Sequence, residues 1–116
     1  MTCLICLSQS PYASQSAKES LDLALVMAAF EQNPGLLFID EGVLQLLPKA
    51  AQPSPHKHIG KVISALEMYD ISQLWVEQES LQAFGLVTEQ LSQPVKLISR
   101  HQIAELWAKY DQHLVF

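Results

Sequence analysis

The chain has 116 residues, of which 49% are hydrophobic and 16% are charged, and its formal net charge is −5. We expect residues 1–116 to form a single domain, because a chain of this length fits one domain. Lysine and arginine form no cluster, so direct nucleic-acid binding, which needs a basic surface, is not expected. No apolar run reaches the roughly 18 residues of a membrane span, so no membrane partner is expected. Charged residues usually make up about a quarter of a soluble domain, so the low charged fraction indicates apolar subunit contacts in addition to a core.

The N-terminal segment is apolar and contains both cysteines of the chain. It lacks the positive segment of a secretory signal, and we predict that it is the first strand, Thr2–Leu7, of a cytoplasmic protein. Cys3 and Cys6 are three positions apart, so on a strand their side chains point to opposite faces and do not form a disulfide. We interpret both as small buried hydrophobic side chains.

Strand and helix patterns alternate along the rest of the chain. The predicted helices are Ser14–Glu31, His58–Met68, Ser80–Phe84 and Ser99–Lys109. The predicted later strands are Leu36–Ile39, Gln73–Glu77, Val95–Ile98 and His113–Phe116. This order predicts a three-layer α/β/α domain with a mostly parallel five-stranded sheet. The first helix is apolar around most of its circumference, so we expect it either to be sandwiched within the domain or to be shared with a partner.

Local signals place several helix ends. Ser16 and Glu19 have the spacing of a capping box, and so do Ser99 and Gln102. Gly85 follows the third predicted helix and is expected at the C′ position, where a left-handed backbone ends a helix.

The apolar run Leu36–Ile39 stops abruptly at an acidic pair, Asp40 and Glu41. A run without alternation is typical of a strand buried on both faces of a parallel sheet, and such folds place their sites at the carboxyl ends of the strands. Asp40 and Glu41 are therefore candidates for an acidic rim, which Glu77 is positioned to join. Neighbouring acids point apart on an extended backbone, so the pair is poorly suited to acid–base catalysis. Its alternative role is a solvated turn that ends a buried strand.

An apolar patch follows this turn at once, within residues 42–48. Its members are the candidate interface residues Val43, Leu44, Leu46 and Leu47. Exposed apolar patches mark contacts with other proteins, so we expect this patch and the first helix to supply the main subunit contacts.

Other chemistries are weakly represented. The polar turn Ser8–Ser14 has no glycine that would let the backbone approach a phosphate. His56 and His58 lie in the loop Lys49–His58 without a nearby cysteine or carboxylate, so we interpret them as solvated and not as metal ligands. No nucleophile stands beside a base. The sequence therefore predicts no catalytic residue, no cofactor and no metal site.

A set of short segments carries a family pattern: Ser10-Pro-Tyr, Ser20-Leu-Asp-Leu-Ala, Phe38-Ile-Asp-Glu-Gly-Val-Leu-Gln-Leu-Leu-Pro48, Met68-Tyr-Asp-Ile71, Leu74-Trp-Val, Ser80-Leu, Gly85-Leu, Tyr110-Asp and Leu114-Val-Phe116. Together they resemble the TusC/DsrF family of sulfur-relay proteins, within the wider DsrE-like group with its flavodoxin-like topology. The similarity covers nearly the whole chain in order. The acidic-Gly-Val-x-Gln-Leu-Leu-Pro element is its most specific part.

The resemblance implies a subunit of a complex built from TusB-like, TusC-like and TusD-like chains, usually a dimer of trimers. Such a complex takes persulfide sulfur from one transient carrier protein and passes it to another, for the 2-thio group of the tRNA wobble uridine. The persulfide-carrying cysteine of the family belongs to the TusD-type subunit, at the end of the third strand. That sulfur slot corresponds here to Val76 or Glu77, and neither is a cysteine. The resemblance therefore implies a noncatalytic subunit.

Two alternatives stay open. The first is an autonomous protein that uses Cys6 or the Ser8–Ser14 turn, either as a small thiol-dependent sulfurtransferase or as a small-ligand-binding α/β protein. The second is a homo-oligomer that works without partners.

Overall fold

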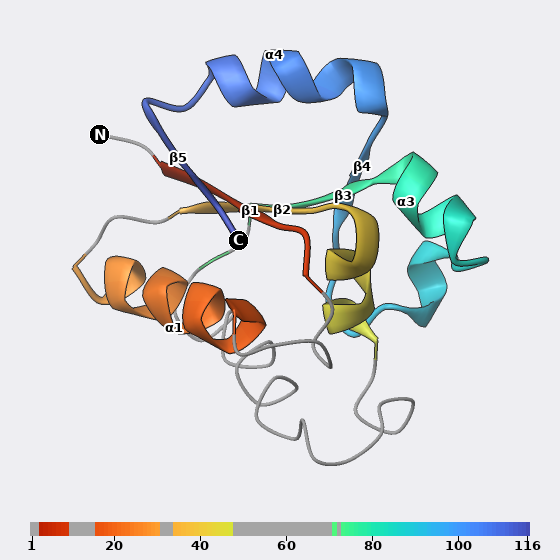
Figure 1. Ribbon diagram of the computed structural model, residues 1–116, viewed down its shortest axis with the longest axis horizontal. Coiled ribbons are helices and arrows are strands. Elements are labelled where there is room, and N and C mark those ends of the chain that lie inside the picture. The colour runs from red at the N-terminus through yellow and green to blue at the C-terminus, as the bar shows by residue number, and fades with distance from the viewer. Residues whose placement is uncertain (1–2, 10–15, 31–33, 48–70, 72) are drawn as a thin grey trace.

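The computed structural model describes residues 3–9, 16–30, 34–47, 71 and 73–116 (Figure 1). The strands are β1 (Cys3–Leu7), β2 (Gly35–Phe38), β3 (Leu74–Glu77), β4 (Lys96–Ile98) and β5 (Gln112–Val115). The α-helices are α1 (Ser16–Ala29), α3 (Gln78–Ala83) and α4 (Ile103–Ala108). Three 3₁₀ segments are η1 (Asp40–Leu46), η4 (Thr88–Gln90) and η5 (Arg100–Gln102). The predicted loop Lys49–His58 and helix His58–Met68 lie outside the described residues.

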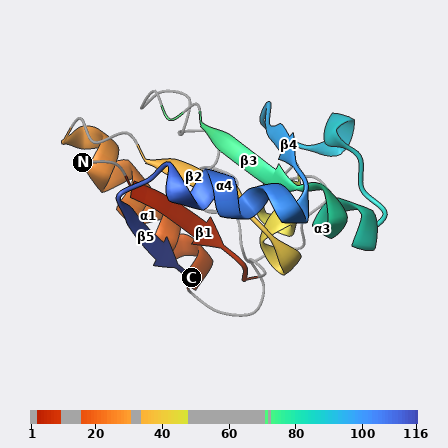
Figure 2. The same ribbon diagram turned by 90° about the horizontal axis from the view of Figure 1, so that it is seen from above.

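The five strands form one sheet in the order β4-β3-β2-β1-β5, and every pairing between them is parallel. From β1 to β4 the chain steps across the sheet in one direction, and it then returns across the sheet to place β5 beside β1. Crossovers between parallel strands are right-handed, so the forward steps and the return step use opposite faces. Figure 1 accordingly shows α1 and η1 on one face of the sheet and α4 on the other, and Figure 2 shows α4 lying over the strands. The predicted α/β class, with a parallel five-stranded sheet between helical layers, is confirmed.

The core divides into two parts, one on each face of the sheet. The larger part lies against α1, η1 and α3; its buried residues are Cys3, Ile5, Leu7, Leu21, Ala24, Leu36, Phe38, Val43, Leu46, Ile71, Leu74, Val76 and Leu81. The smaller part lies under α4; its buried residues are Leu4, Cys6, Leu37, Ile98 and Leu106. Successive residues of β1 and of β2 contribute to opposite parts, because side chains alternate across a strand. Their unbroken apolar sequences are the direct consequence of burial on both faces.

The predicted helix ends are largely present. Gly85 has φ of 66°, its N–H donates to Gln82 O at 3.0 Å, and Leu86 N–H donates to Leu81 O at 2.9 Å. This is the Schellman pattern, with glycine in the left-handed conformation. At the start of the fourth predicted helix, Ser99 N–H donates to Gln102 Oε1 at 3.0 Å, as a capping box requires. The helix there begins as the 3₁₀ turn η5 and becomes α4 only at Ile103.

The start of α1 differs from its prediction in one respect. The capping box predicts Ser16 as the N-cap, which is the residue just before the helix. In the structure Ser16 is instead the first residue of α1. The residue at the N-cap position itself lies outside the described residues.

Candidate functional site

The carboxyl ends of β3 and β4 flank a topological switch point. The segment after β3 packs Leu81 into the larger part of the core, and the segment after β4 packs Leu106 into the smaller part on the opposite face. In open α/β sheets, sites lie where connections from adjacent strands leave on opposite faces. Glu77 ends β3, and Arg100 follows β4 after one intervening residue. This edge is therefore where the fold favours a functional site.

An ion pair closes the gap between the two strands. Arg100 Nη2 lies 3.1 Å from Glu77 Oε1, and Arg100 Nε lies 3.3 Å from Glu77 Oε2. The two contacts make a bidentate pair, the strongest common geometry between these groups. The Glu77 side chain is only 6% exposed, whereas that of Arg100 is 64% exposed. The guanidinium therefore covers a buried carboxylate from the solvent side.

Two further loops are tied to this carboxylate. Ser80 Oγ donates to Glu77 Oε1 at 2.5 Å and accepts a hydrogen bond from the Asp40 backbone N–H at 2.8 Å. Asp40 has φ of 49°, in the left-handed region that Asp tolerates better than most residues. The carboxylate of Glu79 accepts the backbone N–H of Arg100 at 3.0 and 3.1 Å. The loops after β2, β3 and β4 are thus joined into one network, which we call the Glu77 network.

The protonation state of Glu77 follows from its neighbours. Burial acts to raise the pKa of the Glu77 carboxyl, but hydrogen bonds from Arg100 and Ser80, together with the guanidinium charge, outweigh burial and lower that pKa. The same pairing raises the pKa of Arg100. Both groups are charged at neutral pH. An ionised carboxylate has no proton to donate, and that of Glu77 already accepts hydrogen bonds from Arg100 and Ser80.

The structure separates the two residues predicted for the sulfur slot. Val76 is fully buried in the larger part of the core, whereas Glu77 lies at the strand end and joins the polar network. The sequence analysis named Ser80 only as part of the family pattern and of a predicted helix, and it did not predict a role for Ser80 or for Arg100 at this site. Glu77 and Ser80 are three positions apart at the start of α3, so their contact is local, but they reverse the order of a capping box and carry no recognised sequence signal. Arg100 had none, because its approach depends on the register that sets Glu77 opposite Ile98.

The predicted acidic rim is reduced to Asp40 and Glu41, which are both exposed. Glu77 does not join them as a free acid, because its carboxylate is buried and neutralised by Arg100. The expectation for Glu77 was therefore wrong. The sequence placed it at the correct edge but gave no sign of the cation that pairs with it.

The predicted interface patch is mostly an interior surface. Val43 and Leu46 are fully buried in the core, so they cannot supply contacts to another subunit, and that part of the prediction is wrong. The reason is that η1 lies against one face of the sheet (Figure 1), where Val43 and Leu46 pack into the core. Leu44 and Leu47 are partly buried and are the two members of the patch that reach the surface.

Both cysteines are buried and free of disulfide bonds, as predicted. They contribute to opposite parts of the core, so their side chains lie on opposite faces of β1. Burial raises the pKa of the Cys3 thiol. Burial, with the negative charges of Asp40 and Glu77, raises the pKa of the Cys6 thiol to about 11. Since the thiolate is the reactive form, burial and the raised pKa values both disfavour reaction at these two thiols.

Neither the described part of the Ser8–Ser14 turn nor the groove beside α4 has the features of a small-ligand site. Ser8 is occupied, because its Oγ donates to Phe116 O at 2.7 Å; residues 10–14 of that turn lie outside the described residues. A surface groove of about 240 Å³ lies elsewhere, between β3, β4 and α4, with Trp75 and Lys109 among the residues that line it. Its volume is below the roughly 300 Å³ at which small-molecule pockets begin.

No group of three or more His, Cys, Asp or Glu side chains within the described ranges is arranged to hold a metal ion. His56 and His58 lie outside those ranges. None of the described helices has the length and apolar character needed to cross a membrane.

A family model for DsrE/DsrF-like proteins matches residues 1–116. The chain belongs to the DsrE/DsrF-like family. Among curated proteins, it is 37% identical over 112 residues to the protein TusC homolog of Pseudomonas aeruginosa. The aligned residues cover 94% of this chain and 92% of that protein. It is 32% identical over 111 residues to the protein TusC homolog of Aliivibrio fischeri, with 92% of each chain covered.

Two further relatives extend this comparison. The intracellular sulfur oxidation protein DsrF of Allochromatium vinosum is 32% identical over 84 residues, which span 72% of this chain and 62% of that protein. Among solved structures, the YchN protein of E. coli superimposes with a TM-score of 0.82 over the full length of both chains at 20% identity. At that identity, the superposition supports the fold alone.

Proposed function

We propose that this chain is a noncatalytic subunit of a cytoplasmic sulfur-relay complex. In this proposal it assembles with TusB-like and TusD-like subunits into a dimer of trimers, which exchanges persulfide sulfur with transient carrier proteins for 2-thiolation of the tRNA wobble uridine. The similarity to TusC homologs and to DsrF supports the placement in sulfur chemistry.

One observation carries the noncatalytic part of the proposal. The resemblance assigns the sulfur carrier to Val76 or Glu77; Val76 is fully buried in the core, and the carboxylate of Glu77 is held by Arg100 and Ser80. The chain has two cysteines in all, and both are buried with raised pKa values. Persulfide transfer needs an accessible thiolate at the receiving atom. The receiving thiol must therefore come from another subunit.

The test is co-expression with TusB-like and TusD-like subunits, followed by transfer of radiolabelled sulfane sulfur from a persulfide donor. The label should appear on a partner and not on this chain. A variant with Cys3→Ala and Cys6→Ala should assemble and should support transfer at the wild-type rate. Circular dichroism of the variant checks that its fold is retained.

Label recovered on Cys3 or Cys6, or loss of transfer in the double variant with an intact fold, would instead support an autonomous thiol-dependent sulfurtransferase. A mass measurement of the protein expressed alone distinguishes a homo-oligomer from a subunit that needs partners.

A further inference from the structure

Helix α1 presents apolar side chains on the side that faces away from the sheet. Its inner side buries Leu21 and Ala24 completely in the core. On the outer side, Val26 is 54% exposed and Phe30 is 75% exposed, the largest exposed fraction among the large hydrophobic side chains of the described residues. Phe30 follows the last residue of α1, but its N–H still donates to Val26 O at 3.3 Å, so it continues the same helical turn.

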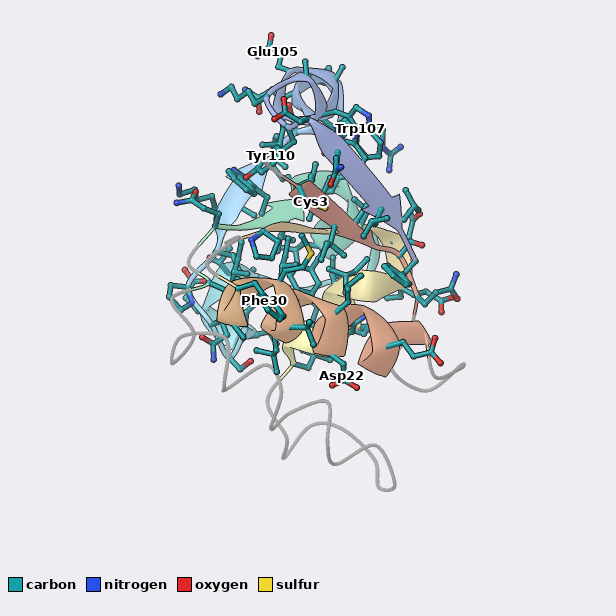
Figure 3. All side chains as sticks on the ribbon, turned by 90° about the vertical axis from the view of Figure 1, so that its left-hand side faces the viewer. Cys3, Asp22, Phe30, Glu105, Trp107 and Tyr110 are labelled. Carbon is teal, nitrogen blue, oxygen red and sulfur yellow. The ribbon has the colours of Figure 1, made fainter. Side chains whose placement is uncertain are left out.

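These residues form one line along the helix. Leu23, Val26 and Phe30 have the spacing i, i+3, i+7, which places them on a single face. Asp22 lies four positions before Val26, and Glu19 lies four positions before Leu23; both acids are exposed. Figure 3 shows Asp22 extending from α1 away from the sheet. We call these five residues the outer stripe; it is acidic toward the start of α1 and apolar toward its end.

We propose that the outer stripe is a docking surface for an amphipathic helix of another subunit, whose apolar side chains cover Val26 and Phe30 and whose lysine or arginine side chains face Glu19 and Asp22. The inference rests on the proposed function. Apolar residues spaced i, i+3, i+7 are the anchors that one helix offers to another. A cluster of this kind is costly to leave in water, and exposed apolar patches mark contact sites.

The negative charges of the outer stripe indicate which kind of partner can bind there. Two copies of α1 packed in parallel would bring the acids of both copies together. Packed antiparallel, they would place Glu19 and Asp22 beside the carboxyl end of the other helix, which has no basic residue in its last turn and carries partial negative charge. Both arrangements are repulsive, so a second copy of this chain is disfavoured. An anionic membrane surface is disfavoured for the same reason, since interfacial helices are rich in lysine and arginine. A partner helix that carries both basic and apolar residues complements both ends of the outer stripe.

The test uses the complex formed on co-expression with TusB-like and TusD-like subunits, measured by size-exclusion chromatography with light scattering. Val26→Asp should reduce the affinity for the partner at least tenfold. The matched control is Val87→Asp, because Val87 is also 54% exposed but lies outside α1. The control should assemble like the wild type. Asp22→Lys should weaken assembly several-fold at low salt and less at high salt, since screening removes its effect.

Each outcome decides a separate point. If Val26→Asp assembles as well as the wild type, the outer stripe is not the docking surface. The same conclusion follows if Val26→Asp and the control Val87→Asp lose assembly to the same extent. If the chain alone forms a dimer that Val26→Asp disrupts, the occupant is a second copy and the proposal is wrong. If the chain binds phosphatidylglycerol vesicles through the stripe, a membrane replaces the partner. If the wild type binds neither subunit, the proposed function itself fails.

Discussion

Gly42 should be the least replaceable glycine among those the structure describes. A Cβ added at Gly42 would overlap the carbonyl oxygen of Leu7 and would lie 2.6 Å from the carbonyl carbon, whereas real Cβ atoms essentially never approach another heavy atom within 3.0 Å. Both atoms belong to the backbone of β1, a central and fully buried strand, so they cannot move aside. The same Leu7 oxygen accepts the N–H of Ile39 at 3.0 Å, and a displaced η1 would lose that bond.

These terms set the size of the effect. Overpacking of a close contact costs about 1–3 kcal/mol, and the lost hydrogen bond costs about 1 kcal/mol. Gly42→Ala should therefore lower the free energy of unfolding by about 3 kcal/mol. For a domain of this size, that corresponds to a fall in Tm of roughly 10 °C. Urea unfolding followed by circular dichroism, with linear extrapolation to water, measures the difference directly.

Gly85 provides the control because its reason for being glycine is different. A Cβ at Gly85 would meet nothing within 4 Å, but its φ of 66° is unfavourable for side-chain-bearing residues. Gly85→Ala should cost about 1 kcal/mol from the backbone conformation alone, and Gly85→Asn should cost less. The steric argument for Gly42 is refuted if Gly42→Ala is no more destabilising than Gly85→Ala.

Three further perturbations test other parts of the structure. Pairing lowers the pKa of Glu77 below its ordinary value of 4.5, so its charge stabilises the fold above that pH and ceases to do so as the pH falls through the lower value. Glu77→Gln should therefore be less stable than the wild type at pH 7, with the gap narrowing toward pH 3 in unfolding curves; a constant gap would contradict the pairing. With a pKa of about 11, Cys6 is a thiolate in about one molecule per thousand at pH 8, so iodoacetamide should label it far more slowly in native protein than in urea. Equal rates in the two conditions would show that the thiol is accessible. Gly35→Ala would place a Cβ 2.7 Å from a ring carbon of Tyr110 and 2.9 Å from one of Trp75, which are side chains that can shift, so we expect a loss of about 1–2 kcal/mol with a change in Trp75 fluorescence. Unchanged fluorescence would mean that the ring of Trp75 does not pack on Gly35.

The class of fold was predictable because its signals are local. The unbroken apolar run before Asp40 predicted a strand buried on both faces, and β2 is buried throughout. The spacing of Cys3 and Cys6 predicted opposite faces of β1, because side chains alternate along any strand. Gly85 and the Ser99–Gln102 pair marked helix ends through backbone requirements that hold in every protein. Each of these inferences needed only neighbouring residues.

The burial of the 42–47 segment was not predictable in the same way. Val43 and Leu44 are equally apolar neighbours, yet Val43 is fully buried and Leu44 reaches the surface. Their composition indicated a contact surface but not whether that surface faces the sheet or a partner. The answer depends on the close approach of Gly42 to Leu7, which lies 35 residues earlier in the sequence.

By itself, the sequence determined the alternation of strands and helices, the placement of the two thiols on opposite faces of the first strand and the absence of cysteine from the end of the third strand. Only the tertiary structure decided that Arg100 reaches Glu77, because the contact arises from the parallel register of β3 and β4 and from the opposite faces taken by their connections. Periodicity is a property of adjacent residues, so it can be read along the chain. A salt bridge between residues 23 positions apart is a property of how the strands pair, and pairing exists only in the folded molecule.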